Sequence, residues 1–270
     1  MQRSIDCLFI TPEHPMYNRH PFRPLFSLSA AALVLGGSFG LTQKPLMAQA
    51  GLNLNLPGLS APGNRQSGST RSETCVAADA PLQLTALMPE SNYGQTIDAY
   101  PSFFFYLPET DAEAVKFVVY NETTNALFYE GEFSPQGKSG IFSLDIPDNG
   151  VQKALELGES YYWYLSIACD IEDPSANIVV GGTVARVAAS EAVEEALATA
   201  TPEQLPGIYA SAGLWHDALA ASAQLAQDTS DSVAWSALLT AIDLQHLLEI
   251  PVLSDKVTLE PEAGPVIDPS

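Results

Sequence analysis

The sequence has few residues that could carry catalysis, metal binding or redox chemistry. It holds three cysteines and four histidines in 270 residues, and no Cys-x-x-Cys pair occurs, so redox catalysis and zinc binding lack their usual motif. Beyond residue 50 the histidines are His216 and His246, and neither stands in a catalytic motif. Gly158-Glu159-Ser160 begins like a nucleophile elbow, but Tyr162 stands where that motif needs its second glycine. We therefore predict no catalytic residue, no metal site and no cofactor.

Basic residues are also scarce. Eleven Lys and Arg residues stand against 32 Asp and Glu residues, and the net charge is −21. A strongly negative surface repels nucleic-acid phosphates and anionic lipids, so we expect no nucleic-acid partner and no attachment to anionic membranes. A solvated acidic surface that keeps the chain soluble is the simplest interpretation of this charge.

The first 50 residues have the pattern of a secretory signal. Three arginines precede an uncharged apolar run over residues 25–41, and Ala48-Gln49-Ala50 matches a signal-peptidase site. We predict a signal peptide over residues 1–50 and an exported protein of the periplasm or cell surface, with no stable membrane span after cleavage. An uncleaved anchor is the alternative, because the apolar run is close to the shortest length that spans a bilayer.

Removal of the signal segment would leave two cysteines, Cys75 and Cys169. An exported chain matures in an oxidising compartment, where two remaining cysteines are candidates for a disulfide. Two free buried thiols are the alternative.

The composition divides the rest of the chain into four segments. Residues 51–80 are rich in Gly, Pro and Ser and lack a sustained apolar period, which predicts a flexible arm. Residues 81–189 hold β-rich runs between turn signals, residues 190–250 are rich in Ala and Leu, and residues 251–270 are typical of a disordered acidic tail. We expect a β domain followed by a helical region.

Seven short strands with regular turns favour an antiparallel β-sandwich of the immunoglobulin-like or fibronectin-like class. Period-two alternation supports them, because Val115, Phe117 and Val119 fall on one face. Gly181-Gly182 predicts a bulge or a close backbone approach inside the last strand. The predicted strands are 82–88, 102–107, 115–120, 126–133, 140–146, 161–169 and 177–187.

The predicted helices run from Ser190 or Glu191 to about Ala200, over residues 214–226, and from about Asp231. Thr201 with Gln204 has the pattern of a capping box. The segment 209–219 resembles part of a tetratricopeptide repeat, which packs two antiparallel helices. Since one such unit cannot stand alone, we expect a tetratricopeptide-like hairpin that packs on the sandwich.

Aromatic residues are the strongest candidates for a binding surface. Neighbours in a strand point to opposite faces, so half of each aromatic run fills the core and the other half faces outward or meets the helices, and covered packing is the simpler interpretation. An exposed set would suit a protein or glycan partner. The candidate surface residues are Phe104, Tyr106, Tyr162, Tyr164, Trp215 and His216.

Acidic residues offer two further interpretations. Asp170, Glu172 and Asp173 cluster in one predicted turn and have the oxygen ligands that calcium prefers, although without EF-hand spacing, and a solvated turn is the simpler interpretation. Asp170 and Glu172 could also act as paired carboxylates of a carbohydrate-active hydrolase, with Trp163 or Tyr164 as a sugar platform.

The order of motifs resembles a family of exported cyanobacterial proteins known as domain of unknown function number 928. The resemblance covers most of residues 65–245 and implies an exported acidic chain with a β region and a helical end, but no activity. The family usually has a tyrosine where His216 stands, which argues against a catalytic role for this histidine. The matching segments are Gly68 to Cys75, Leu84 to Glu90, Tyr106 to Pro108, Tyr161 to Tyr164, Cys169-Asp170, Gly182 to Val187, and Tyr209 to Leu219.

Together these features predict a non-catalytic interaction module of the cell envelope with an envelope protein as partner. The hydrolase and a purely structural envelope component are the alternatives.

Overall fold

The computed structural model of the chain describes residues 52–68, 75–77, 80–170, 172–229 and 232–253. The predicted signal segment and most of the predicted tail lie outside these residues. Within the described ranges, no helix is both long and apolar enough to cross a membrane.

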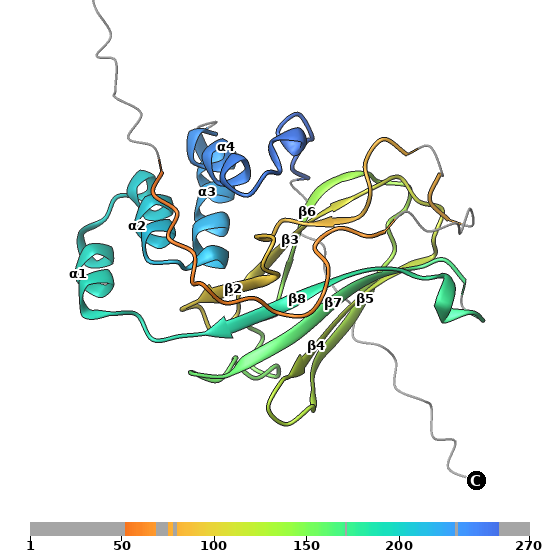
Figure 1. Ribbon diagram of the computed structural model, residues 1–270, viewed down its shortest axis with the longest axis horizontal. Coiled ribbons are helices and arrows are strands. Elements are labelled where there is room, and N and C mark those ends of the chain that lie inside the picture. Colours follow the sequence, from red (N-terminus) through yellow and green to blue (C-terminus); the bar gives the residue numbers. More distant parts are fainter. Residues whose placement is uncertain (1–51, 69–74, 78–79, 171, 230–231, 254–270) are drawn as a thin grey trace, which may run out of the picture. The chain divides into compact units, whose positions relative to one another are not determined.

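The described strands form two sheets (Figure 1). The smaller sheet has the order β1-β3-β6 and the larger has the order β2-β8-β7-β4-β5. All neighbours are antiparallel except β2 and β8, which are parallel. The strands are β1 (Thr85–Ala86), β2 (Tyr93–Thr96), β3 (Ser102–Leu107), β4 (Ala114–Asn121), β5 (Leu127–Phe133), β6 (Gly140–Asp145), β7 (Ser160–Ala168) and β8 (Ile178–Arg186).

The seven predicted strands are all present, although the first is reduced to β1, and β2 was not predicted. The short β2 contains a glycine and two polar residues, so its own sequence has little strand signal. It becomes a strand through its parallel pairing with β8, ninety positions later in the chain.

The two sheets face each other through an aromatic core. Phe103 of β3 lies 5.0 Å from Phe117 of β4, and Phe105 lies 5.5 Å from Trp163 of β7, measured between ring centroids. All four side chains are at most 1% exposed. The predicted mixed architecture of packed β-sheets with helices is therefore confirmed at this level.

The other face of β3 is covered by helices. Phe104 lies 5.9 Å from Trp235, edge to face, and both Phe104 and Tyr106 are buried. The continuous apolar run of β3 thus reflects a strand with both faces covered. Figure 1 shows helices α3 (Trp215–Thr229) and α4 (Val233–Ala241) on the side of the smaller sheet that faces away from the larger one.

The helices begin where the sequence indicates. Ser190 accepts a hydrogen bond from the Val193 backbone at 3.3 Å, and Thr201 and Gln204 form the predicted capping box. Helices α2 and α3 contact each other across a turn in which Gly213 has φ 78°, a conformation that favours glycine. The helices are α1 (Glu191–Thr199), α2 (Leu205–Ser211), α3 (Trp215–Thr229) and α4 (Val233–Ala241), with 3-10 turns η1 (Pro174–Ala176), η2 (Pro202–Gln204) and η3 (Gln245–Leu247).

Residues 52–68, the longest described part of the flexible arm predicted over residues 51–80, differ from the prediction. The Asn55 backbone donates to Ala210 of α2, and the Ser67 backbone donates to Leu84, each at 3.0 Å. Leucines at alternate positions, Leu52, Leu54 and Leu56, pack against the core. Composition alone misses this segment, because its order comes from contacts with distant residues.

The start of the predicted tail also differs from the prediction. The Ile141 backbone of β6 donates to Pro251 at 3.0 Å, and the Leu253 backbone donates to Ile141 at 2.7 Å. Residues 251–253 therefore lie along β6 like a short extra strand.

The predicted close approach at Gly181-Gly182 is confirmed. A Cβ atom on Gly182 would lie 2.8 Å from the Asn92 carbonyl oxygen and 2.9 Å from the Trp163 ring. Only glycine leaves room for the backbone of residue 92 and the core tryptophan at this point.

Candidate functional site

Cys75 and Cys169 form the predicted disulfide. Their Cα atoms are 5.1 Å apart, and the bond joins positions 94 residues apart in the sequence. It fixes the segment before β1 to the end of β7, where the Cys75 carbonyl also accepts hydrogen bonds from the Thr110 hydroxyl and the Asp111 backbone. A disulfide is typical of proteins that mature in an oxidising compartment.

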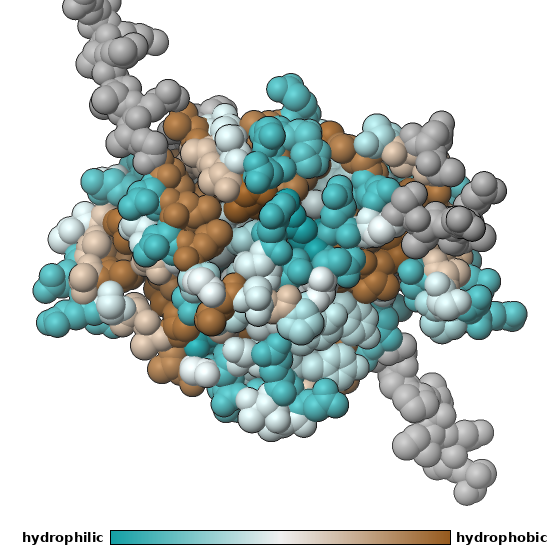
Figure 2. Space-filling view, in the orientation of Figure 1, coloured by the Kyte–Doolittle hydropathy of each residue, from teal (hydrophilic) through white to brown (hydrophobic). Residues whose placement is uncertain are grey.

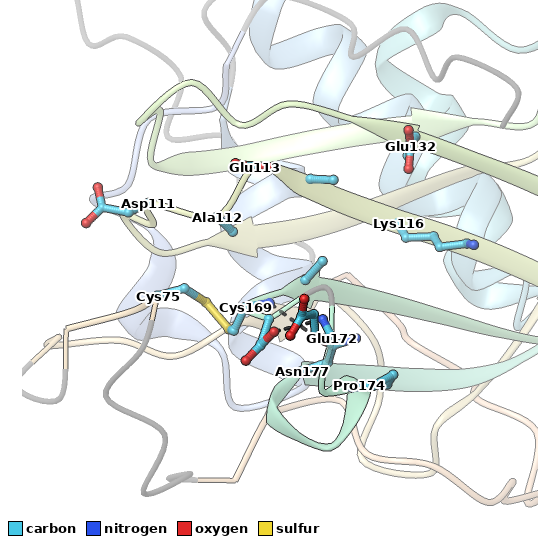
Figure 3. Close-up of a pocket in the computed structure, with 13 residues that line it drawn as sticks. Cys75, Asp111, Ala112, Glu113, Lys116, Glu132, Cys169, Glu172, Pro174 and Asn177 are labelled. Atoms are coloured by element: carbon cyan, nitrogen blue, oxygen red, sulfur yellow. Dashed lines mark hydrogen bonds between the residues drawn. A yellow bond between two sulfur atoms is a disulfide. The ribbon is translucent and has the colours of Figure 1, made fainter. Parts of the chain in front are cut away.

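A hollow of about 1050 Å³ opens beside this disulfide (Figure 3). It lies where β4 begins and β7 ends, and Glu132 of the neighbouring strand β5 also lines it. Figure 3 draws the disulfide close to Glu172 and Asn177, with Lys116 and Glu132 on the neighbouring strands.

Negative charge dominates the hollow. Lys116 is its one basic lining residue, and it pairs with Glu130 at 2.5 Å. Five carboxylates in one concave surface favour cationic groups of a partner. These acidic lining residues are Asp111, Glu113, Glu132, Asp170 and Glu172.

The acidic turn after β7 uses its carboxylates to hold its own backbone. Asp170 accepts hydrogen bonds from the backbone of Glu172 at 2.8 Å and of Asp173 at 3.3 Å. Asp173 accepts from the backbone and hydroxyl of Ser175, and these hydrogen bonds lower the pKa of Asp173. Asp170 and Asp173, two of the three predicted calcium ligands, therefore stabilise the turn through hydrogen bonds to its backbone.

The described residues hold no group of three or more His, Cys, Asp or Glu side chains arranged to bind a metal ion. The hydrolase alternative keeps one supporting feature, since Asp170 and Glu172 both line the hollow. The two come from the same turn, whereas glycosidase carboxylates flank the scissile bond from two sides. Trp163 is 1% exposed and cannot act as a sugar platform.

The predicted aromatic surface divides into a buried part and an accessible part. Phe104 packs against Trp235 of α4, Tyr106 is buried, and Trp215 is fully buried with its indole N–H donating to the Leu87 carbonyl at 3.0 Å. His216 is also buried. These four predicted surface residues are corrected to core positions. The first turn of α3 packs Trp215 and His216 against the strands, and α4 covers Phe104.

Tyr162 and Tyr164 are the accessible part. Both project from the outer face of the larger sheet and are half-buried. Tyr120 of β4 joins them, with its ring 6.4 Å from that of Tyr164 and nearly parallel to it. Burial raises the pKa of Tyr164, and the nearby Tyr120 raises it further, so its hydroxyl stays neutral at neutral pH.

We did not predict Tyr120 as a site residue, although strand alternation contains the signal. Tyr120 and Lys116 have the same parity in β4, opposite to Phe117, and therefore lie on the outer face. Cross-strand neighbours could not be assigned from sequence, because the pairing of Tyr120 with Tyr162 depends on the register of β4 with β7.

His216 and Asp217 form a second titratable pair at the start of α3. The imidazole Nδ1 lies 3.3 Å from the Ser102 carbonyl oxygen, and Nε2 has no hydrogen-bond partner among the described residues. Burial lowers the pKa of His216 to about 4. Burial raises the pKa of Asp217 to about 6, although hydrogen bonds from Thr96 and the Ile97 backbone oppose this shift.

A neutral imidazole could act as a base only if a reactant reached it. The His216 ring packs 5.0 Å from Phe103, and a Cβ atom on Gly94 would lie 2.8 Å from its Nε2. This contact with β2 closes the ring in on that side. The geometry favours a packing role for His216.

Comparison with known proteins identifies a family but no activity. The model of a family described as Domain of Unknown Function (DUF928) matches residues 66–252. No curated protein and no solved structure matches the chain.

Proposed function

Since the chain belongs to the DUF928 family, whose description assigns no activity, we propose its function from its geometry: an exported, non-catalytic interaction module of the cell envelope. It binds an envelope protein through the outer face of the larger sheet. The predicted signal segment and the Cys75–Cys169 disulfide support export.

The tyrosine cluster on this outer face is the observation on which the proposal rests. Tyr120, Tyr162 and Tyr164 lie within 6.5 Å of their nearest ring neighbours and are only half-buried. Tyrosine is enriched at protein interfaces, because one side chain offers both a large apolar ring and a hydroxyl for hydrogen bonding.

The acidic hollow extends the same face. Ala114 and Lys116 of β4 line the hollow and have the same parity as Tyr120, and Ala168 has the same parity in β7 as Tyr164. One continuous face thus bears tyrosines toward one end and carboxylates at the other. Such a surface combines an aromatic contact region with charges that steer and orient a partner.

Figure 2 agrees with this division of the surface. The area over β4 and β7 is mostly pale and teal, whereas brown apolar surface gathers over the helices and the segment that begins at residue 52. A face with tyrosine and charge but little aliphatic surface is more typical of an interface with a partner that binds and dissociates than of a permanent subunit interface.

We also propose that the β region is immunoglobulin-like. In that fold one sheet holds strands A, B and E and the other holds C, F and G. The chain order and neighbours of β1, β3 and β6 agree with A, B and E, and those of β4, β7 and β8 agree with C, F and G. Two features depart from antibody domains, since Trp163 is on the strand matched to F and Cys75 precedes β1. The α2–α3 pair with its Gly213 turn supports the tetratricopeptide-like interpretation of the hairpin.

The test is quantitative co-purification after chemical cross-linking of the native envelope. Truncated baits are unsuitable, because the helices contribute Trp215 and Leu238 to the common core. Full chains are therefore compared as wild type, as Tyr162→Ala/Tyr164→Ala, and as the control Val151→Ala, whose side chain is 88% exposed and outside the larger sheet.

A partner recovered with wild type and control, but at least about tenfold less with the double variant, is the expected result. Equal recovery with all three chains would exclude this face as the binding site. Turnover of a glycan by the purified chain, abolished by Asp170→Asn or Glu172→Gln, would instead establish the hydrolase.

A further inference from the structure

Each sheet has two edge strands; two of these four edges are paired with other segments of the chain, and a third edge strand packs against a helix. At β1 the Ala86 backbone donates to Arg65 at 2.6 Å, so residues 65–67 lie along this strand. At β6 residues 251–253 take the same place. Helix α3 packs against β2, and Asp217 accepts a hydrogen bond at 3.2 Å from the backbone of Ile97, directly after this strand.

The fourth edge, β5, lacks such a cover. In the described part of the chain, residues 127–133 make backbone hydrogen bonds only within the sheet. One side chain reaches this strand, since Gln152 donates to the Phe128 carbonyl at 3.2 Å. A bare strand edge is a template for another strand, and proteins usually block it.

The side chains of β5 also leave the core incomplete at this edge. Leu127 is 52% exposed, and the aromatic residues Phe128, Tyr129 and Phe133 are only partly buried against the core. A further strand beside β5 would cover apolar surface that the chain itself leaves open.

Charge indicates which strand would fit. Glu130 and Glu132 project from the outer face of β5, on either side of Gly131. If two copies of β5 paired antiparallel about Gly131, Glu130 of each copy would face Glu132 of the other, which is unfavourable. Basic residues at alternate positions would instead face these glutamates, and apolar residues between them would cover the aromatic side.

We infer that β5 is an acceptor edge for strand addition, and that its occupant is an extended segment of a partner protein with Lys or Arg at every second position. This inference rests on the proposed function and specifies the partner's chemistry. Backbone hydrogen bonds along β5 hold the segment. Glu132 and the acidic hollow select its charge, and Glu130, which already pairs with Lys116, adds a second carboxylate beside them.

The test uses the full chain and three synthetic heptapeptides. The first alternates valine and lysine, the second alternates valine and glutamate, and the third is the lysine peptide with N-methyl groups on two adjacent Val-Lys pairs, so that donors on both edges of the peptide are removed. N-methylation removes backbone donors without changing charge. Fluorescence anisotropy measures affinity, and hydrogen exchange locates the peptide on the chain.

The lysine peptide should bind and slow amide exchange within residues 127–133, while the glutamate peptide should not bind. N-methylation should weaken binding about tenfold, because several backbone hydrogen bonds are lost. Glu130→Gln/Glu132→Gln should weaken binding roughly threefold to tenfold. The exposed α1 pair Glu194→Gln/Glu195→Gln removes the same charge elsewhere and should leave affinity unchanged.

Three results would overturn the inference. The N-methylated peptide could bind as tightly as the lysine peptide, or the lysine peptide could slow amide exchange only at residues outside β5. The third is a dimer in sedimentation whose association is strengthened by Glu130→Gln/Glu132→Gln. The last would identify a second copy as the occupant. None of them bears on Tyr162 and Tyr164, so the tyrosine-face experiment still decides the proposed function separately.

Discussion

Strands β4 and β7 have one face inside the protein and one outside, and the two faces follow different rules. Phe117 and Trp163 on the inner face are at most 1% exposed and contact aromatic rings of the opposite sheet. Tyr120 and Tyr164 on the outer face are half-buried and contact each other. The same backbone thus presents closely packed hydrocarbon on one side and amphipathic rings on the other.

This difference separates stability from recognition. A fully buried ring loses its packing when it is truncated, whereas a half-exposed ring on an open face loses only part of its contacts. Substitutions on the inner face should therefore change the free energy of unfolding most, and those on the outer face should change binding most.

The largest effect is expected for Trp163→Ala on the inner face. Removal of a fully buried indole should lower the free energy of unfolding by about 3–5 kcal/mol, measured by urea denaturation. Trp163→Phe is the matched control and should cost much less, because the indole N–H has no hydrogen-bond partner among the described residues and a phenyl ring leaves no donor unsatisfied. A small effect of Trp163→Ala would mean that the two sheets are not closely packed.

The disulfide at the open end of the larger sheet should have the second largest effect. Cys75→Ala/Cys169→Ala should lower the free energy of unfolding by about 2–4 kcal/mol, because the bond constrains the unfolded chain. The wild type in strong reductant should unfold at the same urea concentration as the double variant. If reductant does not destabilise the wild type, the bond is not formed in the mature protein.

A third prediction concerns a buried carboxyl group, that of Asp217. The pKa of Asp217 is raised from 3.8 to about 6, with burial as the main cause and nearby Asp98 adding to it. A raised pKa means that the stability from protonated Asp217 is complete below pH 3.8 and is lost as the pH rises through 6. Asp217→Asn should therefore gain on the order of 2–3 kcal/mol relative to wild type between pH 4 and pH 7.

The neighbouring histidine gives the opposite dependence and serves as the control. The pKa of His216 is lowered from 6.5 to about 4 by burial, so the stability of its neutral ring is present above pH 6.5 and lost as the pH falls to 4. The variant Asp217→Asn retains His216, so urea denaturation at several pH values should show that its stability still falls at low pH. A difference between wild type and Asp217→Asn that does not depend on pH would show that Asp217 is not buried as described.

Sequence predicted the inner face better than the outer one. Alternation identified Val115, Phe117 and Val119 as one core face, because the hydrophobicity of a core side chain can be recognised in the sequence itself. It left open whether Phe104 and Tyr106 face outward or meet the helices, and their place among the candidate surface residues is corrected by the structure, which buries both. That assignment depends on where the helices dock, which no local pattern encodes.

Predictions from the sequence were also wrong or incomplete for segments whose structure depends on contacts with distant residues. The arm over residues 52–68 reads as a tether, yet its order comes from contacts with α2, β1 and β8. The acidic hollow was only partly foreseen. Asp170 and Glu172 are neighbours in the sequence, and their proximity could be predicted. The other three carboxylates, Asp111, Glu113 and Glu132, join them only because β4, β5 and β7 adopt one particular register.

The smallest change in stability is expected for Tyr162→Ala, and this prediction tests the comparison most directly. Tyr162 pairs with Thr183 across β7 and β8, and its hydroxyl reaches over Gly181, where a Cβ atom would lie 2.9 Å away. Since the ring is only half-buried, its removal should lower the free energy of unfolding by about 1 kcal/mol or less in the urea experiment used for Trp163→Ala. Partner recovery should nevertheless fall, because the lost ring belongs to the recognition face. A destabilisation as large as that of Trp163→Ala would show that the outer face is a second core surface, and the tyrosines would then explain stability instead of binding.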